Sequence, residues 1–349
     1  MRVLVTGSEG YIGSVLVPLL VDRGHDVVGL DTGYFADALL LPPAASKLTR
    51  RADMRETRAG DLRGFDAIIH LGALSNDPWG QLNPELTHQI NYECSVNLAR
   101  LAKQAGVPRF LFSSSCSTYG AASQGAVVET DELNPLSAYA VAKVNAERDI
   151  APLADGRFAP TFLRNSTVYG VSPRMRFDLV LNNLAGWAFT TGKIVIQSDG
   201  TPWRPLVHVR DVSAAFIAIM EAPRELVANQ VFNIGQEGEN YQVRDLAAAT
   251  KKEFQGSTLV YANQSVNPDA RSYRVSFRKF WSAFPNLRFE WNAEKGLREA
   301  HEVFERIGLT SERFEHRDFV RLKRIEYLLE TGALDQELRW TYALVGGRA

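Results

Sequence analysis

A tyrosine and a lysine stand four residues apart in the middle of the chain, at Tyr139 and Lys143. Residues with this spacing lie on one face of an α-helix, so the lysine ammonium can favour the phenolate and lower the pKa of the tyrosine. A phenolate that forms near neutral pH can take a proton from a substrate hydroxyl while hydride leaves the same carbon for a nicotinamide. A pair with this spacing is common and mostly structural, so its interpretation depends on the rest of the chain.

Three glycines near the N-terminus, Gly7, Gly10 and Gly13, follow a β-branched run and precede a helical pattern. Gly7 permits a tight turn, Gly10 lets backbone N–H groups approach a pyrophosphate, and Gly13 lets helix and sheet pack closely. Asp31 closes the second predicted strand eighteen residues after Gly13, where a carboxylate binds both ribose hydroxyls and repels a 2′-phosphate. The pattern predicts a site for NAD rather than NADP. The alternative, an ordinary βα turn with a solvated acid, is disfavoured by the three features together.

Further candidate ligands follow other predicted strands. The segments His70–Ser75 and Phe112–Gly120 both contain hydroxyl side chains, and the second is rich in serine. Asp53 and Met54 end another predicted strand, where they could hydrogen-bond and pack against adenine. Because the carboxyl ends of parallel strands meet at one edge of a sheet, we expect all of these residues along one crevice.

The elements that must position these residues alternate between short β-branched runs and helical segments, which is typical of βαβ units. Parallel strands joined by right-handed crossovers carry helices on both faces. We therefore predict an α/β fold, a Rossmann-type doubly wound parallel sheet with a smaller interleaved C-terminal substrate lobe. The predicted strands of the sheet are Val3–Thr6, Val27–Asp31, Ala67–Leu71, Arg109–Ser113 and Thr161–Arg164.

Beyond Gly170 the alternation weakens. A helical stretch over Phe177–Phe189, a strand over Lys193–Gln197 and a strand over Val231–Ile234 are predicted there, and the last fifty residues are expected to be helices without a recognisable motif. We assign residues 1–170 to an NAD-binding domain that has later returns near 205–235. Residues 171–204 and 236–349 form the expected substrate-binding lobe and C-terminal helices.

The charge balance excludes several classes of partner. The 349 residues contain 39 basic and 40 acidic side chains, for a formal net charge of -1, so we expect no binding to nucleic acid or to a membrane surface. No apolar run approaches the roughly 20 residues that span a bilayer, and we expect no targeting segment. The two cysteines, Cys94 and Cys116, cannot build a disulfide framework or a zinc site by themselves. We therefore expect a cytoplasmic protein without a bound metal.

The glycine turn, Asp31, the serine strand and the Tyr139/Lys143 pair follow one another along the chain. In this order they resemble the extended short-chain dehydrogenase/reductase family, and specifically its nucleotide-sugar epimerases and dehydratases, over residues 1 to about 280. The resemblance implies that Tyr139 is the base, that Lys143 holds Tyr139 and the nicotinamide ribose, and that Ser115 hydrogen-bonds the sugar hydroxyl that is oxidised. It implies NAD as the cofactor and a nucleotide-diphosphate sugar as the substrate.

By the same resemblance, Arg204 and Arg271 bind the diphosphate of the substrate, because planar guanidinium groups pair bidentately with phosphate. Surface or lobe-bridging arginines are the alternative. The residues expected at the cofactor are Gly7, Gly10, Tyr11, Ile12, Gly13, Asp31, Asp53, Met54, Leu71, Gly72, Ala73, Tyr139 and Lys143. Those expected at the substrate are Ser75, Ser115, Ser117, Thr167, Arg176, Arg204 and Arg271.

Three positions depart from the family pattern. The 4,6-dehydratases of the family carry an Asp-Glu pair directly after the hydroxyl residue, where this chain has Cys116 and Ser117. Serine is a poor acid, and a thiol with a reference pKa of about 8.5 is a weak one, so the usual proton donors for dehydration are missing. We favour Cys116 as a small buried filler and keep a role as acid or base as the alternative. Thr167 stands where the family usually has an asparagine that contacts the diphosphate.

The expected activity is C4 epimerisation of a nucleotide sugar through a transient 4-keto sugar, with tightly retained NAD and no net redox change. One alternative is a dehydratase, decarboxylase or C3/C5 epimerase that uses the same keto sugar with Cys116 as acid or base. Another is a regulatory protein that binds NAD without chemistry. The resemblance also implies a homodimer in which each subunit contributes the helices Pro84–Ala105 and Ser137–Ile150.

Overall fold

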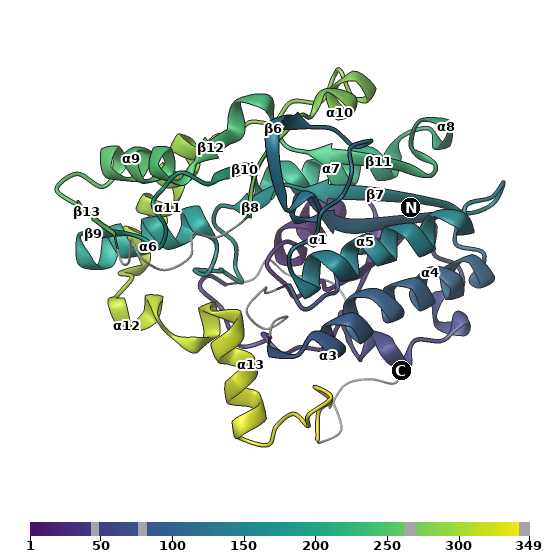
Figure 1. Cartoon of the computed structure of the whole chain (residues 1–349). Coiled ribbons are helices and arrows are strands. Elements are labelled where there is room, and N and C mark those ends of the chain that lie inside the picture. Colours follow the sequence, from purple (N-terminus) through teal and green to yellow (C-terminus); the bar gives the residue numbers. More distant parts are fainter. Residues whose placement is uncertain (43–48, 76–81, 262–270, 342–349) are drawn as a thin grey trace.

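A parallel sheet of seven strands forms the centre of the computed structural model, which describes residues 1–42, 49–75, 82–261 and 271–341 (Figure 1). The strand order is β11-β7-β5-β4-β1-β2-β3, and the winding direction reverses between β1 and β4. This order confirms the predicted Rossmann-type fold and leaves a crevice at the carboxyl ends of the strands. The strands are β1 (Arg2–Thr6), β2 (Asp26–Asp31), β3 (Thr49–Arg51), β4 (Ala67–His70), β5 (Arg109–Ser115), β7 (Ala159–Asn165) and β11 (Gln230–Ile234).

Helices cover both faces of this sheet. Val3 and Val5 of β1 pack with α1 and α7, whereas Leu4 between them packs with α4 and α5 in a separate cluster. Because successive side chains of a strand point to opposite faces, strands that are apolar throughout require a helical layer on each side. The helices are α1 (Gly13–Asp22), α3 (Pro84–His88), α4 (Cys94–Ala105), α5 (Ala138–Ile150) and α7 (Val209–Glu221).

Smaller sheets and further helices, most of them from the second half of the chain, lie beside the central sheet (Figure 1). The helix predicted from Phe177 begins at Val180, and the strand predicted over Lys193–Gln197 ends at Ile196. The small sheets are β12-β10-β8, β13-β9 and β14-β6, built from β6 (Ala121–Val127), β8 (Thr167–Tyr169), β9 (Lys193–Ile196), β10 (Trp203–His208), β12 (Asn240–Gln242), β13 (Thr258–Tyr261) and β14 (Ser272–Val275). The remaining helices are α6 (Val180–Thr191), α8 (Arg224–Val227), α9 (Val243–Glu253), α10 (Arg278–Ala283), α11 (Ala293–Ile307), α12 (Ser311–Phe314) and α13 (Arg321–Glu330).

Two local expectations differ from the structure. The helix predicted over Pro84–Ala105 contains a π-helical turn at Gln89–Glu93 between α3 and α4. Asp53 does not end a strand, because β3 stops at Arg51 and the Asp53 side chain accepts the N–H of Arg55 at the start of a short 3-10 turn. A side-chain acceptor that caps a turn competes with continued strand pairing, which explains the second difference.

A buried ion pair fixes α5 against the sheet. Arg164 of β7 donates from Nε and Nη2 to the carboxylate of Glu147 on α5, with an Nη2–Oε2 distance of 2.6 Å. The two side chains are 5% and 8% exposed. Ser114 of β5 donates its hydroxyl to the same carboxylate, and Arg164 Nη1 donates to the Tyr119 hydroxyl at 3.0 Å. The ion pair thus joins three elements that reach the crevice.

Loss of one partner from this pair should destabilise the fold. We expect Arg164→Met to lower the free energy of unfolding by about 3–5 kcal/mol, because Glu147 is left buried without a countercharge. Chemical denaturation of the NAD-free protein measures the change. The double variant Arg164→Met/Glu147→Gln removes both charges and should recover much of the loss. Wild-type stability in the single variant would contradict a stabilising role for the pair.

Candidate functional site

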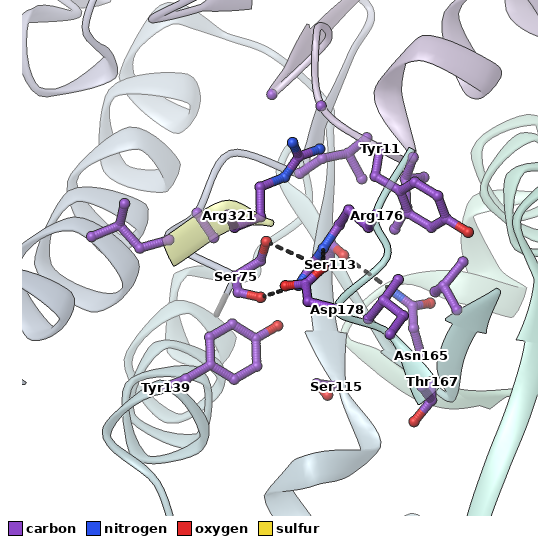
Figure 2. A pocket seen from close by; sticks show the side chains of 18 of the residues that line it. Tyr11, Ser75, Ser113, Ser115, Tyr139, Asn165, Thr167, Arg176, Asp178 and Arg321 are labelled. Carbon is purple, nitrogen blue, oxygen red and sulfur yellow. Dashed lines mark hydrogen bonds and ion pairs between the residues drawn. The ribbon is translucent and has the colours of Figure 1, made fainter. Parts of the chain in front are cut away.

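A cavity of about 770 Å³ runs along the carboxyl ends of the central strands. Every residue expected at the cofactor or the substrate lines this cavity, although these residues come from segments that are far apart in sequence. Cys116 is the one candidate that does not line it. Figure 2 shows Tyr139, Ser115 and Thr167 around one part of the cavity, with Tyr11 and Arg176 at another part.

The glycine turn between β1 and α1 has no room for side chains. Gly7 has a φ of +69°, and a Cβ added there would lie 2.8 Å from the backbone N of Gly72. A Cβ on Gly13 would lie 2.2 Å from the carbonyl oxygen of Gly7. The turn therefore needs glycine on steric grounds, and it leaves backbone N–H groups at the start of α1 facing the cavity, where they can bind an anion.

Two carboxylates stand at the β2 end of the cavity, and they differ in their partners. Asp31 accepts the backbone N–H groups of Glu9 at 3.0 Å and Gly33 at 2.8 Å. Burial raises the pKa of Asp31, and these two hydrogen bonds oppose that increase. Asp53 instead forms an ion pair with Arg55, in which Arg55 Nε lies 3.0 Å and 2.9 Å from the two carboxylate oxygens. Asp31 is therefore the better placed carboxylate for ribose hydroxyls.

Tyr139 and Lys143 share one face of α5, as their spacing predicts. The Lys143 ammonium lies 5.6 Å from the centre of the Tyr139 ring and 4.6 Å from that of Phe112. Its Nζ donates to the carbonyl oxygen of Ser113 at 2.7 Å. Burial lowers the pKa of Lys143 to about 7, although the Glu147 carboxylate one turn away favours the charged form. The lysine can therefore change its charge near neutral pH.

The end of β5 presents hydroxyl groups to the cavity, and β7 adds an amide. Ser115 Oγ accepts the backbone N–H of Ser117 at 3.1 Å, while the buried Ser117 hydroxyl has no hydrogen-bond partner. Asn165 donates from Nδ2 to Ser113 Oγ at 3.0 Å, and its buried Oδ1 is also without a partner. Asn165 was not among the sequence-based candidates, although its position at the end of a predicted strand is the signal that identifies such residues.

Cys116 lies outside the cavity, in the small core cluster with Tyr119 and Val275. It is 1% exposed, and its thiol donates to the carbonyl oxygen of Arg164 at 3.1 Å. Burial raises the pKa of this thiol far above its ordinary value. These contacts contradict the placement of Cys116 as an acid or base at the site and agree with a small buried filler.

Arginines enter the cavity from two directions. Arg176 pairs with Asp178 at 2.8 Å and donates to both the hydroxyl and the carbonyl oxygen of Ser75 at 3.1 Å. Arg204 donates to the carbonyl oxygen of Arg271, so the two arginines predicted for a diphosphate are neighbours. The arrangement provides guanidinium groups that can neutralise phosphate charge.

The C-terminal helix supplies lining residues that sequence reasoning missed. Arg321 and Ile325 of α13 line the cavity, and Tyr34 after β2 lines it beside them. The helix was predicted without a function because it carries no spacing pattern that is tied to a ligand. Only the tertiary structure brings it to the crevice.

Comparison with known proteins identifies the family. The model described as "NAD dependent epimerase/dehydratase family" matches residues 3–235, which is more than half of the chain. The matched residues include the glycine turn, the serine strand and α5. The chain belongs to this family.

Relatives in the NAD-dependent epimerase/dehydratase family are similar over most of the chain. The "Uncharacterized UDP-glucose epimerase YtcB" of Bacillus subtilis (strain 168) is 30% identical over 249 residues, which cover 67% of this chain and 77% of that protein. A UDP-glucose 4-epimerase of Neisseria gonorrhoeae is 28% identical over 338 residues, or 86% and 96% of the two chains. The structure of MoeE5 in complex with UDP-glucuronic acid and NAD has a TM-score of 0.74 and 30% identity, with coverage of 88% and 99%.

The family is NAD-dependent, and the residues of this chain fit that cofactor. The glycine turn excludes side chains where the backbone must approach a pyrophosphate, and Asp31 stands at the end of β2. The NAD cofactor predicted from the sequence is thereby confirmed.

In the part of the chain that the structure describes, no helix is long and apolar enough to cross a membrane. Within the same residues, no group of three or more His, Cys, Asp or Glu side chains could hold a metal ion.

The burial of Lys143 predicts a pH-dependent stability. An unfolded lysine titrates near pH 10.4, whereas the folded pKa is about 7. Below pH 7 both states are protonated and the folded protein carries the full cost of a buried charge; this cost fades as the pH rises from 7 toward 10. Lys143→Met should therefore raise the melting temperature of the NAD-free protein most at pH 6–7 and less at pH 9.

The control for this measurement is Lys251→Met, which changes an exposed lysine on α9. This control removes a lysine that is exposed rather than buried. A stability difference between Lys143→Met and wild type that is constant or grows with pH would contradict a buried lysine with a lowered pKa.

Proposed function

We propose that this chain is an NAD-dependent epimerase that inverts C4 of a UDP-linked sugar. The observation that carries the proposal is that Tyr139, Lys143 and Ser115 line the same cavity as the glycine turn. Several relatives are named UDP-glucose 4-epimerase, and one is named a probable UDP-glucuronate 4-epimerase. The nicotinamide of a bound NAD and the C4 atom of a bound sugar would meet beside Tyr139.

In the proposed mechanism, bound NAD supplies the acceptor for the hydride of C4 and later the donor. The Tyr139 phenolate takes the proton of the C4 hydroxyl, and Ser115 Oγ hydrogen-bonds the same oxygen. The resulting 4-keto sugar turns about its diphosphate linkage and presents its other face. Tyr139 then returns the proton to the oxygen, so the two proton transfers use one group.

Lys143 is proposed to orient the reacting groups. An ammonium has three donors, and the carbonyl oxygen of Ser113 takes one of them at 2.7 Å. The remaining donors are available for the nicotinamide ribose and the Tyr139 hydroxyl. Because Glu147 favours the charged lysine, the charge that stabilises a phenolate is itself supported from one turn further along α5.

The diphosphate of the substrate is proposed to bind Arg204 and Arg271, with Thr167 nearby in the cavity wall. Arg176, which Asp178 and Ser75 hold in a fixed position, is proposed to add positive charge near the diphosphate. Guanidinium groups held by neighbouring acceptors lose little freedom when phosphate binds, which favours tight anchoring while the sugar turns.

A decarboxylase is the second candidate. A relative named UDP-glucuronic acid decarboxylase 1, of Arabidopsis thaliana, is 26% identical over 86% of this chain. In this candidate function, the same 4-keto sugar would lose carbon dioxide. The burial of Cys116 weakens the version of this candidate in which the thiol is an acid or base. A regulatory protein that only binds NAD would not need Tyr139 and Lys143 together in the cavity, so their presence weakens that alternative.

We further propose a homodimer through α4 and α5 and a cytoplasmic location. The exposed apolar side chains of Leu136 and Val141, which are 46% and 39% exposed, lie at the start of α5 and on it. Light scattering of the purified protein measures the mass in solution.

The reaction can be tested in D2O with UDP-glucose, UDP-N-acetylglucosamine and UDP-glucuronic acid, followed by proton NMR. Epimerisation by hydride transfer should give a C4 epimer without deuterium on carbon, because the hydride never exchanges with solvent. Deuterium at C3 or C5, or loss of carbon dioxide or water, would contradict a simple C4 epimerase and favour the second candidate.

Tyr139→Phe should lower turnover by about 10²–10⁴-fold while NAD stays bound, because the variant lacks the proton acceptor but keeps the ring. Cys116→Ala is the matched control and should keep near-wild-type turnover. NMR assays for turnover and nucleotide extraction for bound NAD make the comparison. Normal turnover in Tyr139→Phe would remove this residue from the mechanism, and a large loss in Cys116→Ala would restore the thiol as a candidate.

A further inference from the structure

The C-terminal helix α13 forms part of the wall of the cofactor cavity. Arg321 and Ile325 of this helix line the cavity together with Tyr34 and Phe35, which follow β2. Both α13 residues lie beyond residue 235, where the match to the family model ends. The cavity thus contains side chains that the glycine turn and α5 do not supply.

Hydrogen bonds hold this C-terminal segment on the loop that follows β2. Arg324 Nε donates to the carbonyl oxygen of Tyr34 at 3.0 Å, and the indole N–H of Trp340 donates to that of Thr32 at 2.7 Å. The Tyr34 hydroxyl donates to the carbonyl oxygen of Leu338. Because these bonds join the segment to the residues directly after Asp31, α13 has a defined position at the β2 end of the cavity.

Arg321 is buried and has unused hydrogen-bonding capacity. The residue is 6% exposed, and its Nη2 donates to the carbonyl oxygen of Arg174 at 3.3 Å. Its Nη1 is buried without a hydrogen-bond partner, and Arg321 forms no ion pair with any residue that the structure describes. The guanidinium carbon lies 3.9 Å from the centre of the Phe35 ring, which fixes its plane.

The charges around Arg321 favour a bound anion. Burial, together with the nearby guanidinium groups of Arg176 and Arg174, lowers the pKa of Arg321 to about 9. Asp178 and Asp31 oppose this effect, but Asp178 is already paired with Arg176 at 2.8 Å. A phosphate in the cavity would offset the repulsion among the three guanidinium groups and supply the acceptor that Nη1 lacks.

We propose that Arg321 binds the pyrophosphate of NAD together with the backbone amides of the glycine turn. Asp31 marks the adenosine ribose end of the cavity and Tyr139 the nicotinamide end, so the pyrophosphate lies between them. Gly10 and Arg321 both line the cavity. Figure 2 shows Arg321 and Tyr11 in the upper half of the view, above Ser75. A guanidinium donates two parallel hydrogen bonds to a phosphate. Arg321 would therefore supply the positive charge that the backbone N–H groups of the turn lack.

Binding of NAD fragments to the NAD-free protein tests this role. Arg321→Met removes the charge and keeps a long side chain, while Lys323→Met removes a charge from the exposed face of the same helix as a matched control. Isothermal titration with NAD, ADP and adenosine separates phosphate binding from adenosine binding. We expect Arg321→Met to weaken NAD and ADP about 10-fold or more, with adenosine unchanged. Lys323→Met should bind all three as the wild type does.

Two outcomes would overturn the proposal. Unchanged ADP affinity in Arg321→Met would show that the guanidinium does not contact phosphate. Equal losses for ADP and adenosine would assign Arg321 to shaping the adenosine site through Phe35. Circular dichroism and thermal melting check that the variant folds. If Arg321→Met does not fold, Arg321→Lys is the second variant, because it keeps the charge but loses the two parallel N–H donors of the guanidinium. Its affinity for ADP should fall while its affinity for adenosine stays unchanged. Equal affinities of this variant and the wild type for ADP would contradict the proposal.

These titrations contain no sugar nucleotide. Their failure therefore leaves the proposed epimerase activity untouched, and failure of the epimerase assay leaves the assignment of Arg321 untouched. The probe is the dinucleotide and its fragments alone.

Discussion

The buried pair between Arg164 and Glu147 is the interaction on which the geometry of the site depends. It joins α5 to β7 and, through the hydroxyl of Ser114, to β5. Since α5 carries Tyr139 and Lys143, the pair determines where both side chains stand relative to the ends of the strands. The same Glu147 carboxylate opposes the loss of charge that burial imposes on Lys143. One buried carboxylate thus supports both the position of the helix and the charge of its lysine, with every oxygen satisfied as a buried ion pair requires.

Features that depend on a few neighbouring residues could be predicted from the sequence. The glycine turn follows from steric demands within one strand-to-helix connection, and the structure shows those demands directly at Gly7 and Gly13. The shared face of Tyr139 and Lys143 follows from helical periodicity. Most strands of the central sheet could be located because they contain short continuous apolar runs, which are typical of parallel strands buried on both faces. Even the edge at which the candidate residues meet follows from the rule for the carboxyl ends of parallel strands.

Features that depend on contacts between distant segments could not be predicted. Asp53 ends a short strand pattern in the sequence, but its carboxylate is occupied by Arg55, a partner that only the folded turn selects. Cys116 follows the candidate Ser115 directly, yet the 3-10 turn at that point directs its thiol into the core. Arg321 is separated from the glycine turn by most of the chain, and no local pattern distinguishes it from other arginines of the C-terminal helices. Hydrophobic periodicity locates such a helix but leaves open which cavity it reaches.

The position of α13 bears on how the cofactor is used. An enzyme that exchanges NADH for NAD in each turnover must open its dinucleotide site each time, and the opening contributes to its rate. In this chain the hydrogen bonds from Arg324 and Trp340 hold the C-terminal segment on the loop after β2, and Arg321 of this segment lines the cavity wall. An epimerisation returns the hydride to the sugar that lost it, so the cofactor has no reason to leave between turnovers. A C-terminal segment that is hydrogen-bonded to the loop at one end of the dinucleotide cavity therefore fits a reaction without net redox change better than one that releases reduced cofactor.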